Sequence, residues 1–97
     1  MYARVINIYI KPGSMDEGIN IYENAIVPAM RQQPGFKGTT LLTNRDANTG
    51  ISISLWETEA DMQAGEASGY LQEQLGKAAK LFSAPPANAH YEVSVQV

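Results

Sequence analysis

The chain has 97 residues, a length that suits one folded domain over residues 1–97. Its net charge is −3 with only seven Lys and Arg residues, which gives no electrostatic footprint for nucleic acid and no basic stretch for a membrane surface. It has no cysteine, which excludes disulfides, thiolate catalysis and Cys-based metal sites.

The first predicted element is a strand over Tyr2–Ile10, a run rich in Val, Ile and Tyr that stops at a Lys-Pro-Gly turn signal. Alternate side chains of this strand fall on two faces, and both faces are mostly apolar. A strand of this kind should be covered on both faces. The helices of so small a chain can cover only one face of a sheet, so we expect the other face to meet a second copy of the chain.

A helix is predicted to follow, beginning at Ser14 and running to about Gln32. Ser14 and Glu17 have the spacing of a capping box, in which each side chain bonds a backbone N–H of the first turn. Pro28 lies inside the helical pattern and has no N–H to donate. We therefore expect a kink or loosening from Asn24 to Pro28.

Two strands are predicted next, over Phe36–Arg45 and Ile51–Glu57, joined by a hairpin loop that contains turn residues and a glycine. The second of them alternates cleanly. One face is apolar and consists of Ile51, Ile53 and Leu55. The other face consists of Ser52, Ser54 and Trp56.

The remaining elements are a divided helix and a closing strand. Thr58 repeats the capping signal, Ser68 and Gly69 interrupt the helix, and a second piece is expected over Tyr70–Phe82. A Pro-rich stretch then ends the helix, and His90–Val97 alternates as a strand. The order β-α-β-β-α-β predicts an α+β, ferredoxin-like fold with an antiparallel sheet.

The residue types exclude several kinds of chemistry. His90 is the only histidine and has no acid at a motif spacing, so it is interpreted as a polar residue on a partly exposed sheet face. One histidine supplies one metal ligand, and we expect no metal site. The glycines are scattered and form no phosphate loop, so no cofactor is predicted.

No apolar run approaches the ~20 residues that cross a bilayer, and residues 1–10 lack the features of a secretory signal. The expected location is the cytoplasm.

Two residues stand out as candidates for function. Asn7 lies in the middle of an apolar strand, where a buried amide is costly unless it is hydrogen-bonded. Strands avoid Asn, and such local conflicts tend to mark functional positions. Trp56 is the only tryptophan and ends the third predicted strand. The structural alternatives are a locally bonded amide for Asn7 and core packing for Trp56.

Four segments together resemble the antibiotic biosynthesis monooxygenase family: VPAMRQQPGF, ISLWETEAD, SGYLQEQL and PPANAHYEVSV. The resemblance covers nearly the whole chain and implies a dimeric α/β barrel, in which two sheets meet back to back and each subunit holds a pocket between its sheet and its helices. It also implies that Asn7 and Trp56 line that pocket as catalytic residues. We place Tyr9, Tyr22, Met30, Phe82 and His90 as substrate contacts, with core or interface packing as the alternative for the tyrosines.

The function implied by the resemblance is cofactor-independent monooxygenation of a small aromatic or quinol substrate by a homodimer. In that chemistry Asn7 would donate a hydrogen bond to the substrate oxyanion and Trp56 would wall the ring. No carboxylate or histidine lies at an evident pocket position, and His90 or a tyrosine is the remaining candidate for the general base. The alternative is a non-catalytic, small-ligand-binding or accessory dimer of the same fold. Haem degradation in this family needs a histidine on the helix after the tryptophan, and residues 58–82 contain none.

Overall fold

The computed structural model describes residues 1–97, and strands and helical regions follow one another in the predicted order. All strand pairs are antiparallel, and the sheet order is β2-β3-β1-β4. The predicted α+β, ferredoxin-like fold is confirmed. The elements are β1 (Tyr2–Ile10), α1 (Met15–Ile21), the π-helical turn η1 (Tyr22–Ile26), α2 (Val27–Arg31), β2 (Phe36–Asn44), β3 (Thr49–Trp56), α3 (Glu59–Ala67), α4 (Tyr70–Ala78), the 3-10 turn η2 (Ala79–Leu81) and β4 (Phe82–Glu92).

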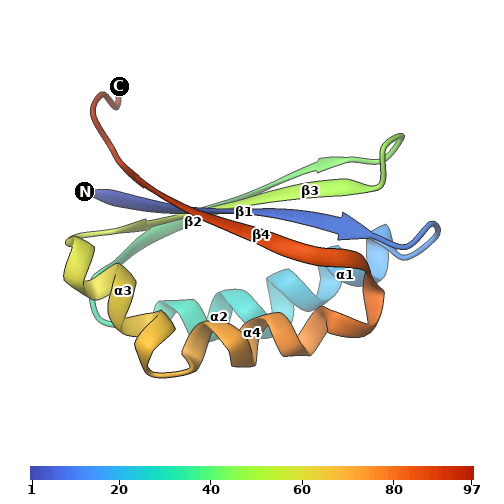
Figure 1. Cartoon of the computed structure of the whole chain (residues 1–97), viewed down its shortest axis with the longest axis horizontal. Coiled ribbons are helices and arrows are strands. Elements are labelled where there is room, and N and C mark those ends of the chain that lie inside the picture. The colour runs from blue at the N-terminus through green and yellow to red at the C-terminus, as the bar shows by residue number, and fades with distance from the viewer.

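The molecule has two layers (Figure 1). All of the helices lie beneath one face of the twisted sheet, and no element covers the opposite face, which we call the open face. The N-terminus and the residues after β4 lie at the end of the sheet beneath which α3 lies, and the residues after β4 rise on the side away from the helices (Figure 1). No helix is long and apolar enough to span a membrane.

The core lies between the layers and depends on the pattern of the helices. Apolar residues recur every three or four positions in both helical regions, so each region presents one apolar stripe to the sheet. Full burial of such a side chain stabilises the fold by about 1.5–3 kcal/mol. The main cluster contains Ile6, Tyr22, Ile26, Met30, Tyr70 and Leu71. A smaller cluster contains Ile10, Met15 and Leu81.

The first helical region loosens where it was predicted to. η1 is a π-helical turn in which Val27 N–H bonds the carbonyl of Tyr22, five residues back, and Pro28 follows directly. Because Pro28 has no N–H for the carbonyl four residues back, the α-helical ladder cannot pass this point unchanged. The extra residue in the turn rotates the helix locally, as π-turns do at many functional sites.

The helix starts differ from one another. Thr58 caps α3 as predicted, because its Oγ1 accepts a hydrogen bond from Asp61 N–H at 3.0 Å. The capping box predicted at Ser14 is wrong, since the Ser14 side chain makes no capping bond. Glu17 instead forms an ion pair with Lys80 at 3.5 Å, which ties α1 to the end of the second helical region.

The closing strand was predicted in the wrong place. β4 runs from Phe82 to Glu92, so Phe82 begins a strand instead of ending a helix, and residues 93–97 lie outside the sheet. Pro85 and Pro86 are inside β4, opposite a break in its register with β1 between Asn7 and Tyr9. The fold tolerates both prolines because β4 is an edge strand and the register break lies at their position.

The open face is apolar in its centre. β1 pairs with β3 on one side and β4 on the other, so residues in register share a face. No helix lies over this face of the sheet (Figure 1). By this register the central members are Ala3, Val5, Asn7, Ile51, Ile53, Leu55, Ala87, Ala89 and Tyr91.

Candidate functional site

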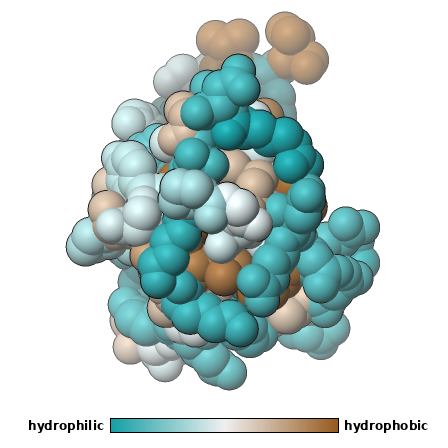
Figure 2. Space-filling view, turned by 90° about the vertical axis from the view of Figure 1, so that its right-hand side faces the viewer, coloured by the Kyte–Doolittle hydropathy of each residue, from teal (hydrophilic) through white to brown (hydrophobic).

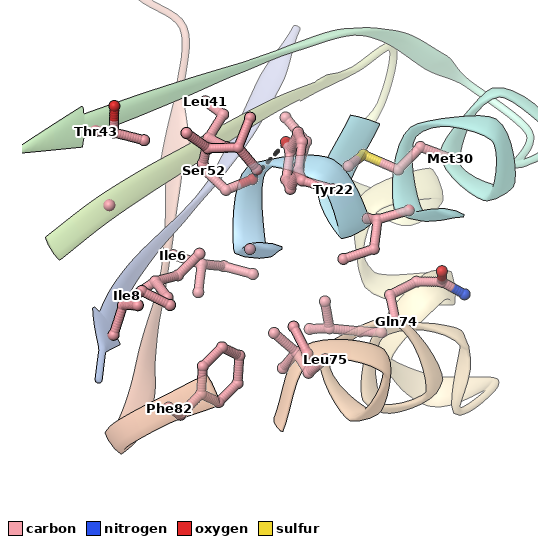
Figure 3. Close-up of a pocket in the computed structure, with 18 of the residues that line it drawn as sticks. Ile6, Ile8, Tyr22, Met30, Leu41, Thr43, Ser52, Gln74, Leu75 and Phe82 are labelled. Carbon is pink, nitrogen blue, oxygen red and sulfur yellow. Dashed lines mark hydrogen bonds between the residues drawn. The ribbon is translucent and has the colours of Figure 1, made fainter. Parts of the chain in front are cut away.

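A cavity of ≈80 Å³ lies between the helices and the covered face of the sheet. Of the 21 residues that line it, 14 are hydrophobic. Figure 3 shows Ile6, Ile8 and Leu41 of the sheet on one side and Met30 and Leu75 of the helices on the other. The even-numbered residues of β1 from Arg4 to Ile10 line this space, because alternate side chains of a strand lie on opposite faces.

The cavity has a mouth and a closed end. Ile10, Thr43, Gly50 and Phe82 lie toward the end of the sheet that carries the β2–β3 hairpin. Figure 2 views the molecule from that end and shows apolar surface inside a hollow that is ringed by hydrophilic residues. The far end, near α3, contains Arg4. A ligand therefore meets an apolar passage first and a charged group last.

Arg4 is held at the closed end by three neighbours. It is buried (2% exposed), and its Nη2 donates a hydrogen bond to the carbonyl oxygen of Met62 in α3. Its guanidinium carbon lies 5.3 Å from the centre of the Trp56 ring, a cation–π arrangement. Nη2 lies 3.7 Å from Glu66 Oε2. Burial lowers the pKa of Arg4, and the nearby Glu66 carboxylate opposes that effect.

Tyr70 shares this end of the cavity. A Cβ placed on Gly65 of α3 would lie 3.2 Å from Tyr70 Cδ2 and 3.5 Å from Arg4 Nη2, so both side chains pack against the same point of the helix. The Tyr70 hydroxyl is buried and has no hydrogen-bond partner. Burial raises the pKa of Tyr70 to about 12, and the hydroxyl is therefore protonated at neutral pH.

Tyr22 bridges the π-turn to the sheet. Its hydroxyl lies 2.5 Å from Thr39 Oγ1 and 2.8 Å from Ser52 Oγ, as the dashed line to Ser52 shows in Figure 3. Thr39 uses its proton on the carbonyl of Ile53, so Tyr22 donates to Thr39 and accepts from Ser52. Tyr22 and Leu41 also line a larger, more open groove beside β2, which adjoins the cavity.

The structure brings together three of the predicted site residues. Tyr22, Met30 and Phe82 line the cavity, the first two at its centre and the last toward its mouth. Trp56 is fully buried (1% exposed) and does not line the cavity. It packs edge-on against Phe36 and beneath Arg4, and its Nε1 donates to Ser54 Oγ at 2.9 Å.

Three other predicted site residues lie away from the cavity. Asn7 and Tyr9 belong to the open face of β1, opposite to the face that lines the cavity. His90 is on the edge strand β4, where its Nε2 lies 2.7 Å from Glu66 Oε2. The predicted placement of Asn7 in the pocket is therefore not what the structure shows. Arg4 is the polar residue of β1 that reaches the cavity.

Arg4, Glu66 and Tyr70 were missed by the sequence analysis. For Arg4 the sequence did contain a signal. Arg4 lies on the same strand face as Ile6, Ile8 and Ile10, and a charged residue on a covered strand face is unusual. No comparable signal exists for Glu66 and Tyr70. Their positions depend on where α3 and α4 cross the sheet.

Comparison with known proteins identifies the family. The model of the antibiotic biosynthesis monooxygenase family matches residues 1–80, and the chain belongs to that family. The uncharacterised protein Rv2558 of Mycobacterium tuberculosis is 36% identical over 64 residues, which cover 66% of this chain. The matched segment is only 27% of the length of that relative.

Solved structures share the fold over nearly the whole chain. A mutant of SnoaB, a cofactor-independent oxygenase from Streptomyces nogalater, has a TM-score of 0.80 at 18% identity and covers 99% of this chain and 95% of its own. The haem degrader MhuD from Mycobacterium tuberculosis, with two haems bound, has a TM-score of 0.80 at 19% identity. It covers 100% of this chain and 99% of its own. At these identities the likeness establishes the fold alone.

Proposed function

We propose that the protein is a cofactor-independent monooxygenase that oxidises a small phenol or hydroquinone in this cavity. The observation that carries the proposal is the apolar cavity between sheet and helices, in a chain that belongs to a monooxygenase family. Its volume of ≈80 Å³ suits a single aromatic ring better than a polycyclic one. An apolar enclosure excludes water from reactive oxygen intermediates.

The proposed reaction needs no external reductant. A phenol gives up its O–H proton and one ring C–H hydrogen, O₂ supplies the oxygen of a new ring carbonyl, and its second atom leaves as water. The products are one quinone and one water for each phenol and O₂, so the substrate supplies all the electrons. The task of the protein is to orient the ring, stabilise the oxyanion and keep water out.

In this scheme Trp56 is a positioning residue. It does not reach the cavity, but its ring lies 5.3 Å from the guanidinium carbon of Arg4, and Arg4 does reach the cavity. The histidine of the chain does not fit haem binding in this cavity. His90 lies on the edge strand beside Glu66, outside the lining.

A second candidate function is binding without turnover. None of the residues that line the cavity is a carboxylate or a histidine, so no conventional general base faces a ligand there. This favours a small-ligand-binding or accessory protein of the same fold. Oxygen consumption distinguishes the two candidates.

The protein is further proposed to work as a homodimer through its open face. That face has an apolar centre with half-buried Val5, Ile51, Ile53 and Leu55, and no element of its own chain covers it. A sheet that is apolar on both faces is normally covered on both. A second copy of the same face would pair with it around a twofold axis.

The test is oxygen uptake by the purified protein with a panel of phenols and hydroquinones, without added metal or flavin. Uptake above autoxidation is expected. Ala78→Leu fills the cavity and should lower uptake at least tenfold, whereas Ala79→Leu, on an exposed position next to it, should leave it unchanged. Circular dichroism checks that both variants fold. Equal uptake by both variants would place the reaction outside the cavity, and no uptake by any protein would favour the binding function.

A further inference from the structure

The closed end of the cavity holds a buried cation with unused donors. Arg4 is the only charged side chain among the residues that line the cavity. Its single hydrogen bond leaves from Nη2, and its buried Nε has no partner. Burying a charge without full hydrogen bonding is costly, and natural proteins rarely retain it without a use.

A second unused donor lies beside it. The Tyr70 hydroxyl is buried without a partner and stays protonated at neutral pH, so it offers a proton and no negative charge. Phenylalanine would fill the same space without leaving an unbonded hydroxyl. Two unpartnered donors, one of them cationic, therefore lie at the same end of one apolar cavity.

The counter-charge of Arg4 is Glu66, which lies outside the cavity lining and whose buried Oε2 has no hydrogen-bond partner. Glu66 is 3.7 Å from Arg4 Nη2 but is partly exposed. Its Oε1 accepts a hydrogen bond from Asn88 Nδ2 at 2.8 Å, and its Oε2 lies 2.7 Å from His90 Nε2. The carboxylate thus approaches Arg4 from the side of α3 and β4. It is not among the residues that line the cavity.

We infer that Arg4 and Tyr70 form an oxyanion site at the closed end of the cavity, which binds the ligand as a phenolate. The acidic oxygen receives hydrogen bonds from both residues, and the ring lies in the apolar part of the cavity. The inference rests on the proposed function in taking the ligand to be a phenol, but it concerns binding alone. It explains how a cavity without a general base can favour the deprotonated substrate, since a cation lowers the pKa of a phenol bound beside it.

The inference is tested with 4-nitrophenol, whose visible absorption reports whether it is bound as phenol or phenolate. Binding to the wild-type protein should lower the ionisation midpoint by at least one pH unit, a tenfold preference for the anion. Arg4→Gln should abolish the shift, and Tyr70→Phe should reduce it. Glu66→Gln removes the competing carboxylate while keeping an acceptor for Asn88, and it should enlarge the shift. Arg45→Gln, at an exposed ion pair with Asp16, is the control without effect.

Nitrobenzene is the control ligand, because it has the same ring without an acidic oxygen. It separates recognition of the charge from recognition of the ring shape. It should bind wild-type protein and Arg4→Gln equally. A parallel loss of both ligands would make Arg4 purely structural, and an unshifted midpoint in the wild type would overturn the oxyanion site. If Arg4→Gln does not fold, the opposite shifts of Glu66→Gln and Tyr70→Phe decide the question. A lowered midpoint without oxygen uptake would reject the oxygenase proposal and leave the oxyanion site intact.

Discussion

Arg4 shows what a single buried charge demands of its surroundings. Its guanidinium is stacked on Trp56, bonded to the backbone of Met62 and balanced by Glu66 at 3.7 Å. Removing one partner of a buried ion pair typically costs about 3–5 kcal/mol, because the other charge remains buried and unpaired. All of these contacts come from the protein itself, and a cation positioned by the protein is the preorganisation that binding of an oxyanion needs.

Tyr70 should make the stability of the protein depend on alkaline pH. Its pKa is raised by burial from 10.0 to about 12, so the unfolded chain loses this proton first as pH rises. The contribution of the protonated hydroxyl to the free energy of unfolding is complete below pH about 10 and declines as pH rises toward about 12. It is on the order of 2 kcal/mol. Urea unfolding of wild type and Tyr70→Phe over this range measures it. Parallel curves for the two proteins would contradict the assignment.

Gly65 and Gly76 form a matched pair of helix glycines. A Cβ at Gly65 would press on Tyr70 at 3.2 Å and lie in ordinary contact with Arg4 at 3.5 Å, whereas one at Gly76 would meet nothing within 4 Å. We expect Gly65→Ala to lower the free energy of unfolding by about 1–3 kcal/mol and to disturb 4-nitrophenol binding. Gly76→Ala should raise the free energy of unfolding by about 0.5–1 kcal/mol. Thermal unfolding of both variants tests the contrast, which would fail if the two changes had the same sign.

The sequence analysis chose Asn7 as the polar residue of β1 that faces the pocket, whereas the polar residue of β1 that lines the cavity is Arg4. Asn7 and Arg4 both interrupt an apolar strand, yet they lie on opposite faces. The face covered by helices is the one that carries Arg4, Ile6 and Ile8. Sequence alternation separates the two faces but does not say which of them the helices cover, because both are mostly apolar.

At the scale of elements, the hydroxyl of Tyr22 connects the π-turn η1 to the sheet by hydrogen bonds. Tyr22 links Thr39 of β2 and Ser52 of β3 at 2.5 and 2.8 Å. We expect Tyr22→Phe to cost about 1–2 kcal/mol, because the buried Ser52 hydroxyl loses its acceptor. In a double-mutant cycle with Ser52→Ala, the combined change should cost less than the sum of the single changes, by about 1 kcal/mol. Strict additivity in urea unfolding would show that the bridge carries no energy.

The element boundaries could be predicted wherever the local pattern decides them. The loosening before Pro28 and the cap at Thr58 follow from a missing N–H and a suitably placed hydroxyl, and both are confirmed. The start of β4 could not be predicted in this way. Pro85 and Pro86 have the local signature of a strand breaker, and only the position of β4 at the sheet edge makes them tolerable.

At the scale of the whole molecule, the open face predicts the oligomeric state. Ile53 lies at its centre, in register with Val5 of β1 and Thr40 of β2. A charge there would be buried in the proposed subunit contact without a partner, so Ile53→Glu should convert a dimer at micromolar concentration into a monomer. Gln72→Glu, on the exposed side of α4, should leave the dimer intact. Sedimentation velocity measures both, and a wild-type monomer would refute the proposed interface.

Asn7 belongs to the same prediction. It lies on the open face between Ile51 and Ala87, so Asn7→Ala should change the dimer dissociation constant and leave the midpoint of bound 4-nitrophenol unchanged. The reverse result, an altered midpoint with an unaltered dimer, would return Asn7 to the ligand site.

The two prolines of β4 also limit how the molecule can grow by self-association. An unprotected sheet edge offers a row of free N–H and C=O groups to which further strands can add without end, as in fibres. Pro85 and Pro86 have no N–H, so a donor is missing from that row, and the bulge beside them bends the strand. Addition of strands at this edge is therefore disfavoured. The proposed face-to-face pairing about a twofold axis would instead bury the apolar surface in a single step and close the assembly.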